Sequence, residues 1–234
     1  MVDYYRTMWS DQLYGALAAS RIIVVVVIDD KKDAVPTARA LARGGITHVE
    51  LALRTDASLA ALEAISREVP EMTVGAGTVL LPAQVRAARD AGAHFAVSPG
   101  LSPAVVAEAE KIGLPFAPGI ATPTDIEKAW NMGCRVLKLF PANPMGGAKY
   151  LKSVNAAYRH LGLSFIPLGG VRLANLDEWL AMPEILAVGG SWPAADDLIR
   201  AGKWDEIETN AQAATEQIAK LRPEAGGGVG QGGA

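Results

Sequence analysis

Lys138 is the residue of this sequence whose chemistry most needs an explanation. It lies inside the apolar run 135–142 (RVLKLFPA), which has the composition of a buried strand. Lysine is seldom buried without a partner, and loss of hydration favours its neutral, nucleophilic amine. The run therefore predicts an activated amine. The alternative is a lysine at the end of a strand that reaches solvent or pairs with a carboxylate.

Glu50 is the carboxylate that fits such an amine best. Side chains of a strand alternate between its two faces, so the segment 48–54 (HVELALR) places Glu50 and Arg54 on one face. A carboxylate inside a sheet needs a cationic or hydrogen-bonding partner, and Lys138 is the candidate that we favour. An ion pair between Glu50 and Arg54 is the alternative.

Short glycine segments follow several of the other apolar runs. The pairs at 169–170 and 189–190, the second followed by Ser191, expose backbone N–H groups that can converge on a phosphate. Each pair alone is also typical of a tight turn. The glycines of the segment 75–78 (GAGT) allow backbone and ligand to approach closely, and Thr78 offers a hydroxyl. The turn 98–100 (SPG) is explained equally well by turn chemistry.

Together these groups describe one chemistry. They are an amine nucleophile, a carboxylate that moves protons, an arginine with a hydroxyl for a carboxylate substrate, and a phosphate cradle. Only about one in a thousand free lysine side chains is neutral at pH 7, and an apolar pocket is a known remedy. The combination predicts a Schiff-base aldolase.

The rest of the chain predicts a scaffold that brings these residues together. Short apolar runs alternate with alanine-rich amphipathic segments, the pattern of parallel strands joined by helices. No Gly-x-Gly-x-x-Gly turn follows the first run, which disfavours an open doubly wound sheet. We therefore expect a (β/α)8 TIM barrel with an extra N-terminal helix within 1–19. The eight expected strands are 22–28, 47–53, 72–76, 93–97, 114–117, 135–142, 165–168 and 185–188. Helices are expected to begin at the cap Asp56 and at Pro82, Pro103 and Pro123.

The amino-acid composition limits the partners and cofactors that are expected for this protein. Half of the 234 residues are hydrophobic, and the formal net charge of −3 gives no electrostatic reason to expect nucleic acid or a membrane as partner. The single cysteine, Cys134, cannot form an internal disulfide, which fits the cytoplasm. We expect one domain over 1–222 and a disordered glycine-rich tail over 223–234. The three histidines show no metal-ligand spacing, so no metal is expected.

At this point the sequence resembles the class I 2-keto-3-deoxy-6-phosphogluconate (KDPG) aldolases and their relatives that cleave 4-hydroxy-2-oxoglutarate. The resemblance runs from about residue 22 to residue 221. It is carried by six segments in order: 49–55 (VELALRT), 74–80 (VGAGTVL), 95–101 (FAVSPGL), 118–122 (PGIAT), 137–142 (LKLFPA) and 189–192 (GGSW).

The resemblance implies a role for each candidate residue. Lys138 would form the Schiff base, Glu50 would be the general acid and base, and Arg54 with Thr78 would hold the pyruvyl carboxylate. It further implies a homotrimer that needs no cofactor beyond the lysine imine, and small 2-keto acids and aldehydes as its partners. The remaining implied residues are Pro99 and Phe140 for the pocket wall, and Gly169, Gly170, Gly190 and Ser191 for the phosphate.

Three positions depart from the family pattern. Leu168 and Ala52 stand where the family commonly has threonine, and Asn143 stands where it commonly has glutamate. The loss of a site hydroxyl changes the binding free energy by about 0.5–1.5 kcal/mol, so these three departures are expected to affect substrate preference. The open alternatives are 4-hydroxy-2-oxoglutarate or another 2-keto acid as substrate, a phosphate-binding barrel isomerase, and a catalytically silent scaffold.

Overall fold

The computed structural model describes residues 8–221, and all of its strand pairs are parallel. The strands are β1 (Ile22–Val26), β2 (His48–Ala52), β3 (Thr73–Gly77), β4 (Phe95–Val97), β5 (Phe116–Ala117), β6 (Gly119–Ile120), β7 (Val136–Leu139), β8 (Ser164–Pro167) and β9 (Val188–Gly190). The helices are α1 (Asp11–Ser20), α2 (Ala34–Arg43), α3 (Ser58–Glu68), α4 (Pro82–Asp90), α5 (Pro103–Ile112), α6 (Pro123–Asn131), α7 (Gly147–Asn155), α8 (Leu176–Leu180), α9 (Asp196–Arg200) and α10 (Trp204–Lys220).

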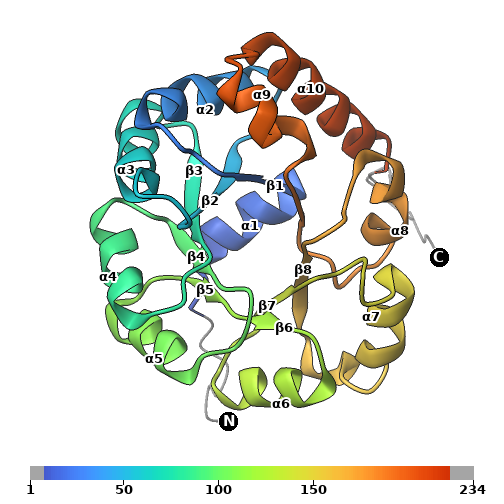
Figure 1. Cartoon of the computed structure of the whole chain (residues 1–234). Helices are drawn as coiled ribbons and strands as arrows, with labels where there is room; N and C mark the ends of the chain where they lie inside the picture. Colours follow the sequence, from blue (N-terminus) through green and yellow to red (C-terminus); the bar gives the residue numbers. More distant parts are fainter. Residues whose placement is uncertain (1–7, 222–234) are drawn as a thin grey trace, which may run out of the picture.

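The strands form two sheets, which the helices surround (Figure 1). One sheet has the order β5-β4-β3-β2-β1-β9, and the other has the order β6-β7-β8. The parallel strands curl into a half-barrel, so the carboxyl ends of β2 and β7 open on the same side of the molecule. This α/β architecture is the one predicted from the alternation of apolar runs and amphipathic segments.

Helix starts follow the local sequence signals in most places. Pro82, Pro103 and Pro123 each open a helix, as predicted, because proline has the backbone angle of the first helical turn and lacks an N–H group that would remain unbonded. The predicted cap at Asp56 is wrong. Helix α3 begins at Ser58, and its N-cap Ala57 has no side chain that could accept a hydrogen bond.

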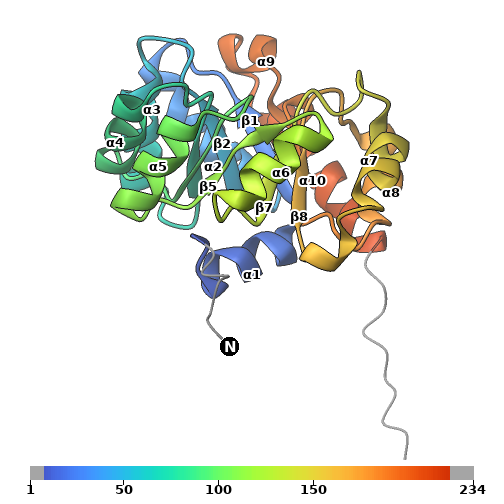
Figure 2. The same ribbon diagram turned by 90° about the horizontal axis from the view of Figure 1, so that it is seen from below.

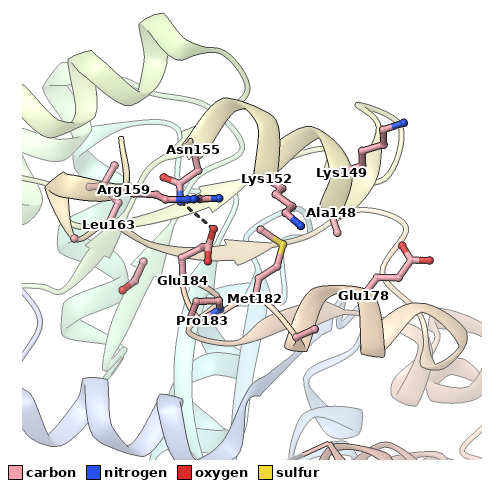
Figure 3. A pocket seen from close by; sticks show the side chains of 13 residues that line it. Ala148, Lys149, Lys152, Asn155, Arg159, Leu163, Glu178, Met182, Pro183 and Glu184 are labelled. Carbon is pink, nitrogen blue, oxygen red and sulfur yellow. Dashed lines mark hydrogen bonds between the residues drawn. The ribbon is translucent and has the colours of Figure 1, made fainter. Parts of the chain in front are cut away.

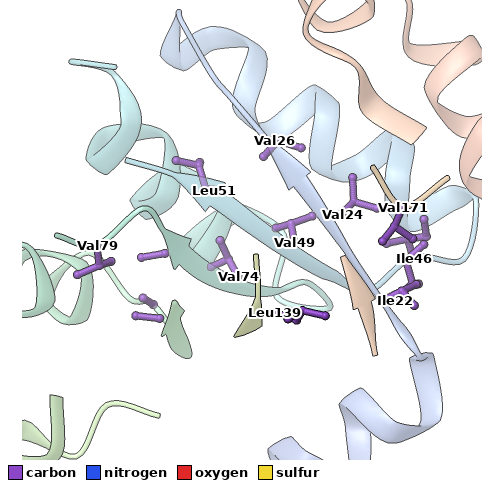
Figure 4. Close-up of a cluster of buried hydrophobic side chains, with 14 of the residues drawn as sticks. Ile22, Val24, Val26, Ile46, Val49, Leu51, Val74, Val79, Leu139 and Val171 are labelled. Atoms are coloured by element: carbon purple, nitrogen blue, oxygen red, sulfur yellow. The ribbon is translucent and has the colours of Figure 1, made fainter. Parts of the chain in front are cut away.

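Alternation along the strands separates two hydrophobic clusters. Ile22, Val24 and Val26 of β1 belong to the cluster between the sheets and the helices (Figure 4). Ile23 belongs to a second cluster, and Val25 packs against it. In β7, Leu137 and Leu139 lie in the first cluster, so Lys138 points to the opposite face, the interior surrounded by the strands.

Helix α1 lies across the end of the molecule where the strands begin (Figure 2). The indole Nε1 of Trp9 donates a hydrogen bond to the carbonyl of Phe116, at the start of β5. The Tyr14 hydroxyl lies 2.7 Å from the Ser164 hydroxyl, at the start of β8. The helix predicted within 1–19 is therefore observed over 11–20 and covers the amino ends of the strands; residues 1–7 are outside the described range.

The structure corrects several other boundaries. The fifth predicted strand, 114–117, is observed as β5 over 116–117, and β6, which belongs to the other sheet, was not predicted; Pro118 between them has no N–H to donate to a ladder. The last strand is 188–190 rather than 185–188, although Ile185 forms an isolated bridge with Phe165. Helix α9 was not predicted. The predicted tail 223–234 lies outside the described residues. Within 8–221, no helix has the length and apolar character that a membrane span requires.

Candidate active site

Lys138 and Glu50 form a buried ion pair. Lys138 comes from β7, where it lies opposite Gly119 and Ile166, and only 4% of its surface is exposed. Its Nζ donates a hydrogen bond of 2.9 Å to Oε1 of Glu50, a residue that is 1% exposed. The predicted pairing of these two residues is confirmed, and the buried amine has the partner that its charge requires.

The alternative ion pair between Glu50 and Arg54 is absent from residues 8–221. Arg54 follows β2 and is exposed, and its side chain lines the cavity that Glu50 and Lys138 also line. The second carboxylate oxygen of Glu50, Oε2, is buried and has no hydrogen-bond partner among the described residues. Glu50 therefore holds the amine with one oxygen and keeps the other as an acceptor inside the site.

Gly77 makes room for this carboxylate. A Cβ atom at position 77 would lie 2.2 Å from Oε1 of Glu50, which is far inside van der Waals contact. Glycine at the end of β3 therefore allows Glu50 to turn toward Lys138. The sequence predicted that Gly77 leaves room for a ligand beside the backbone. In the structure, the carboxylate of Glu50 occupies that room.

Thr78 has a left-handed backbone with φ of 57°. This conformation is unfavourable for a β-branched residue, and such strain tends to occur at functional sites. Thr78 lines the same cavity as Arg54. The strained residue and the guanidinium of Arg54 therefore belong to the wall of one cavity.

The cavity above the ion pair has a volume of about 260 Å³. The Lys138 ammonium lies 5.6 Å from the ring centroid of Phe140, within the range of a cation–π contact. Pro99 lines the cavity as well, and its backbone packs so close to Gly119 that a Cβ there would lie 2.2 Å from the Pro99 carbonyl carbon. All the residues predicted for the site line this one cavity: Glu50, Arg54, Thr78, Pro99, Lys138, Phe140, Gly169, Gly170, Gly190 and Ser191.

Asn143 fixes the loop after β8. Its backbone N–H donates to the Gly169 carbonyl at 2.9 Å, and its side-chain amide donates to the Gly170 carbonyl at 2.7 Å. Both glycines have positive φ, at 94° and 81°, a conformation that other residues adopt at a cost. Because these carbonyls are bonded to the loop after β7, the shape of the glycine loop is set by the strand that carries Lys138.

Further residues line the cavity that the sequence prediction missed. Leu168, noted above only as a departure, is buried, and a Cβ at Gly189 would lie 2.3 Å from its Cγ. The sequence could have predicted the side chains at the end of β1, because residues 25 and 27 lie two positions apart at the carboxyl end of the first apolar run and so share one face of the strand. The missed residues are Val25, Val27, Val171 and Asp196.

The three histidines lie away from the cavity, and residues 8–221 contain no group of three or more His, Cys, Asp or Glu that could hold a metal. His48 is 3% exposed, and burial lowers its pKa to about 4, with a smaller contribution from His94. Its Nδ1 lies 3.1 Å from the Thr47 hydroxyl. His48 shares the inward face of β2 with Glu50, but at the opposite end of the strand.

A larger cavity of about 950 Å³ lies on the outside of the molecule, between α7 and the segment from α8 to residue 184 (Figure 3). Lys149, Lys152 and Arg159 line one side, and the side-chain amide of Asn155 donates to Glu184 at 3.0 Å across it. None of the predicted site residues lines this cavity. The chemistry is therefore concentrated in the smaller cavity at the carboxyl ends of the strands, where α/β barrels carry their active sites.

Comparison with known proteins agrees with this geometry. The sequence is 42% identical over 200 residues to a 2-dehydro-3-deoxy-phosphogluconate aldolase of Treponema pallidum, which covers 86% of this chain and 94% of that protein. It is 37% identical over 208 residues to the KHG/KDPG aldolase of Escherichia coli K12, covering 89% of this chain and 97% of the relative.

A crystal structure of the KDPG aldolase of Legionella pneumophila has a TM-score of 0.83 at 35% identity, and covers 88% of this chain and 99% of that one. That structure holds pyruvate as a covalent carbinolamine intermediate. The profile of the family described as KDPG and KHG aldolase matches residues 14–210. With its buried lysine and carboxylate in a cavity at the carboxyl ends of parallel strands, the chain belongs to the KDPG and KHG aldolase family.

Proposed function

We propose that this protein is a class I aldolase that cleaves KDPG reversibly to pyruvate and glyceraldehyde 3-phosphate, with Lys138 as the Schiff-base lysine. The observation that supports this most strongly is the 2.9 Å contact between Lys138 Nζ and Glu50 Oε1 at the floor of the cavity. The amine and a proton-transferring group are thereby in contact before any substrate binds.

The first step is attack of the neutral Lys138 amine on the C2 ketone of the substrate. Glu50 takes a proton from the ammonium and returns it to the carbinolamine oxygen, so that water leaves and an iminium forms. The free Oε2 of Glu50 supports this role, because it can accept a proton while Oε1 stays at the lysine.

The second step breaks the C3–C4 bond. Glu50, acting through a water, removes the proton of the C4 hydroxyl, and the electron pair of the C3–C4 bond moves toward the iminium nitrogen. The C4 carbonyl leaves as glyceraldehyde 3-phosphate, and the remaining enamine is protonated at C3. Hydrolysis of the imine then releases pyruvate and regenerates Lys138. The covalent imine is the electron sink, so the mechanism calls on no additional cofactor.

Arg54 and Thr78 hold the substrate carboxylate in this proposal, and the loops after β8 and β9 hold the phosphate. A guanidinium recognises a carboxylate through two parallel hydrogen bonds, which also orients C2 toward the amine. Pro99 and Phe140 form the wall beside the reacting carbons. The residues assigned to the phosphate are Gly169, Gly170, Gly190 and Ser191, which supply N–H groups and one hydroxyl.

Release of pyruvate, measured by coupling to lactate dehydrogenase, tests the proposal. The substrates are KDPG, its unphosphorylated counterpart 2-keto-3-deoxygluconate, and 4-hydroxy-2-oxoglutarate. We expect pyruvate from KDPG and none from the Lys138→Ala variant, which leaves Glu50 without its partner and whose fold is therefore checked by circular dichroism. The absence of pyruvate from KDPG would contradict this substrate, and its absence from all three would contradict aldolase activity. Buried Leu168 favours a second candidate within the family, cleavage of 4-hydroxy-2-oxoglutarate, and the same assay ranks the two.

We also propose that the two sheets close into one (β/α)8 barrel. Only Pro118 separates β5 from β6, so the two count as a single barrel strand. On the opposite side, the N–H of Leu186 donates to the carbonyl of Phe165 at 3.0 Å, which ties the segment before β9 to β8. A crystal structure in which 185–190 does not pair with β8 would contradict closure.

We propose a homotrimer in the cytoplasm as the working form. A designed protein cage built by fusing symmetric oligomeric domains is 25% identical, with a TM-score of 0.72, and covers 86% of this chain and 75% of that one. This likeness supports an oligomer of closed symmetry. Sedimentation equilibrium tests the trimer, since a mass of one or two chains at micromolar concentration would rule it out. Cell fractionation tests the location.

A further inference from the structure

Asp196 brings a carboxylate to the end of the cavity assigned above to phosphate. It is the first residue of α9 and lines the cavity, and it belongs to the same connection after β9 as Gly190 and Ser191. Glycine N–H groups and a serine hydroxyl suit an anion, whereas a carboxylate repels one. The two kinds of group therefore make opposite contributions at the same end of the site.

The cations of the cavity do not offset this charge. Among the described residues that line it, the cationic side chains are Lys138 and Arg54. Lys138 is paired with Glu50 and becomes the imine, and Arg54 is assigned to the substrate carboxylate. The nearby Arg200 is bound to Asp29 at 2.7 Å. Arg200 attracts Asp196 at longer range, but no lysine or arginine of residues 8–221 lies within ion-pair distance of Asp196, so no ion pair neutralises its charge at this end.

The start of α9 carries a second acidic residue. Phosphate sites of α/β barrels commonly use the loops after the last two strands together with the N-terminus of a short extra helix. Here that short helix begins Asp196-Asp197, so its first turn supplies its own negative charges. The apolar side chains of Leu168 and Val171 line the same cavity and add no donor for a phosphate oxygen.

We propose that Asp196 is a specificity-determining residue that reduces the preference of the site for a dianionic phosphate over an uncharged, hydroxyl-bearing group at the far end of the substrate. A carboxylate accepts hydrogen bonds from hydroxyl groups, whereas a phosphate of charge near −2 beside it is repelled. This inference rests on the proposed aldolase function and names the substrate class that the far end selects.

The test compares KDPG with 2-keto-3-deoxygluconate, which differ only in the phosphate. Values of kcat/KM are measured for both substrates by pyruvate release, in the unmodified enzyme and in Asp196→Asn. We expect the ratio of kcat/KM for KDPG to that for 2-keto-3-deoxygluconate to rise about tenfold in Asp196→Asn, a change equivalent to about 1.4 kcal/mol. A general loss of stability would lower both values together and leave the ratio unchanged.

Asp197→Asn is the matched control. Asp197 is exposed, lies in the same helical turn and does not line the cavity, so this variant changes the net charge equally without touching the site. We expect its ratio to stay within about twofold of the unmodified enzyme. An unchanged or lower ratio in Asp196→Asn, or an equal rise in Asp197→Asn, overturns the inference while the aldolase function stands. If the unmodified enzyme releases pyruvate from neither substrate, the proposed function fails and the inference fails with it.

Discussion

Lys138 and Glu50 lie 88 positions apart in the sequence and on different sheets, yet their side chains meet at 2.9 Å. The contact exists only because β2 and β7 face each other across the interior of the strands. Removal of one partner of a buried ion pair typically costs about 3–5 kcal/mol, because the remaining charge stays uncompensated. The pair therefore links the stability of the fold to the chemistry of the site.

Glu50→Gln tests the acid and base role. Glutamine keeps the size and one hydrogen-bond acceptor but cannot exchange a proton, so we expect kcat to fall by about 10²–10⁴-fold with a much smaller change in KM. Steady-state pyruvate release measures both constants, and circular dichroism confirms the fold.

Glu63→Gln is the control for that experiment. Glu63 lies on α3, and its ion pair with Arg67 is largely exposed, so both kcat and stability should stay close to those of the unmodified enzyme. Retention of full kcat by Glu50→Gln would show that another group moves the protons.

Gly77→Ala should damage the site without a change in any chemical group. The added Cβ would lie 2.2 Å from Oε1 of Glu50, so the carboxylate must move away from Lys138. We expect a loss of at least tenfold in kcat and a decrease in Tm, because overpacking of a well-packed interior costs about 1–3 kcal/mol. Thermal unfolding and the pyruvate assay measure the two effects.

Gly15→Ala provides the comparison for this substitution. No atom lies within 4 Å of a Cβ at position 15, which is inside α1, so alanine should stabilise the helix by about 0.5–1 kcal/mol and leave kcat unchanged. Equal activity in the two variants would contradict the account of Gly77.

His48 should make folding stability depend on pH. Its pKa is lowered from 6.5 to about 4 in the folded protein, mainly by burial. Between these values the unfolded chain binds a proton that the native state does not, so stability falls as the pH falls, by about 1.4 kcal/mol per pH unit and about 3 kcal/mol in total. Above pH 6.5 the residue contributes no pH dependence. Urea unfolding at a series of pH values measures the slope.

Comparison with variants isolates the histidine from carboxylates that titrate in the same range. The slope between pH 6.5 and 5 should decrease in His48→Gln and stay the same in His160→Gln, since His160 is exposed. An unchanged slope in His48→Gln would show that this residue is protonated in the native state.

Cys134 should be unreactive until the protein unfolds. The thiol is 1% exposed, and burial raises its pKa to about 12, so little thiolate exists at pH 8. We expect no reaction with Ellman's reagent in the native state, and one thiol per chain in 6 M guanidinium chloride, roughly the concentration at which even hyperstable proteins unfold. Rapid labelling of the native enzyme would contradict the burial of this residue.

The sequence predicted the interior of the site better than its outer end. A lysine and a glutamate inside apolar strands can be placed from alternation alone, because each strand has only two faces. Proline signals likewise located the starts of α4, α5 and α6, the last at Thr122-Pro123. These are local properties, and the structure agrees with them.

The outer end depends on how loops pack, and the sequence carries little of that information. Asp196 was missed because the helix α9 has only five residues, too few to show a helical period in the sequence. The role of Gly77 was misassigned to a ligand, because only the packing of β2 against β3 shows which atom needs the space. Strand β6 was not predicted, because its two residues follow Pro118 and only their pairing with β7 identifies them as a strand.

Borohydride reduction in the presence of pyruvate is the most direct test of the central claim, that Lys138 forms the imine. The enzyme is reduced with and without pyruvate, digested, and mapped by mass spectrometry. We predict that the peptide containing Lys138 gains the mass of one pyruvate less one water plus two hydrogens, that activity is lost, and that Lys152 remains unmodified. Full activity after reduction, or a label on any lysine other than Lys138, would contradict the account.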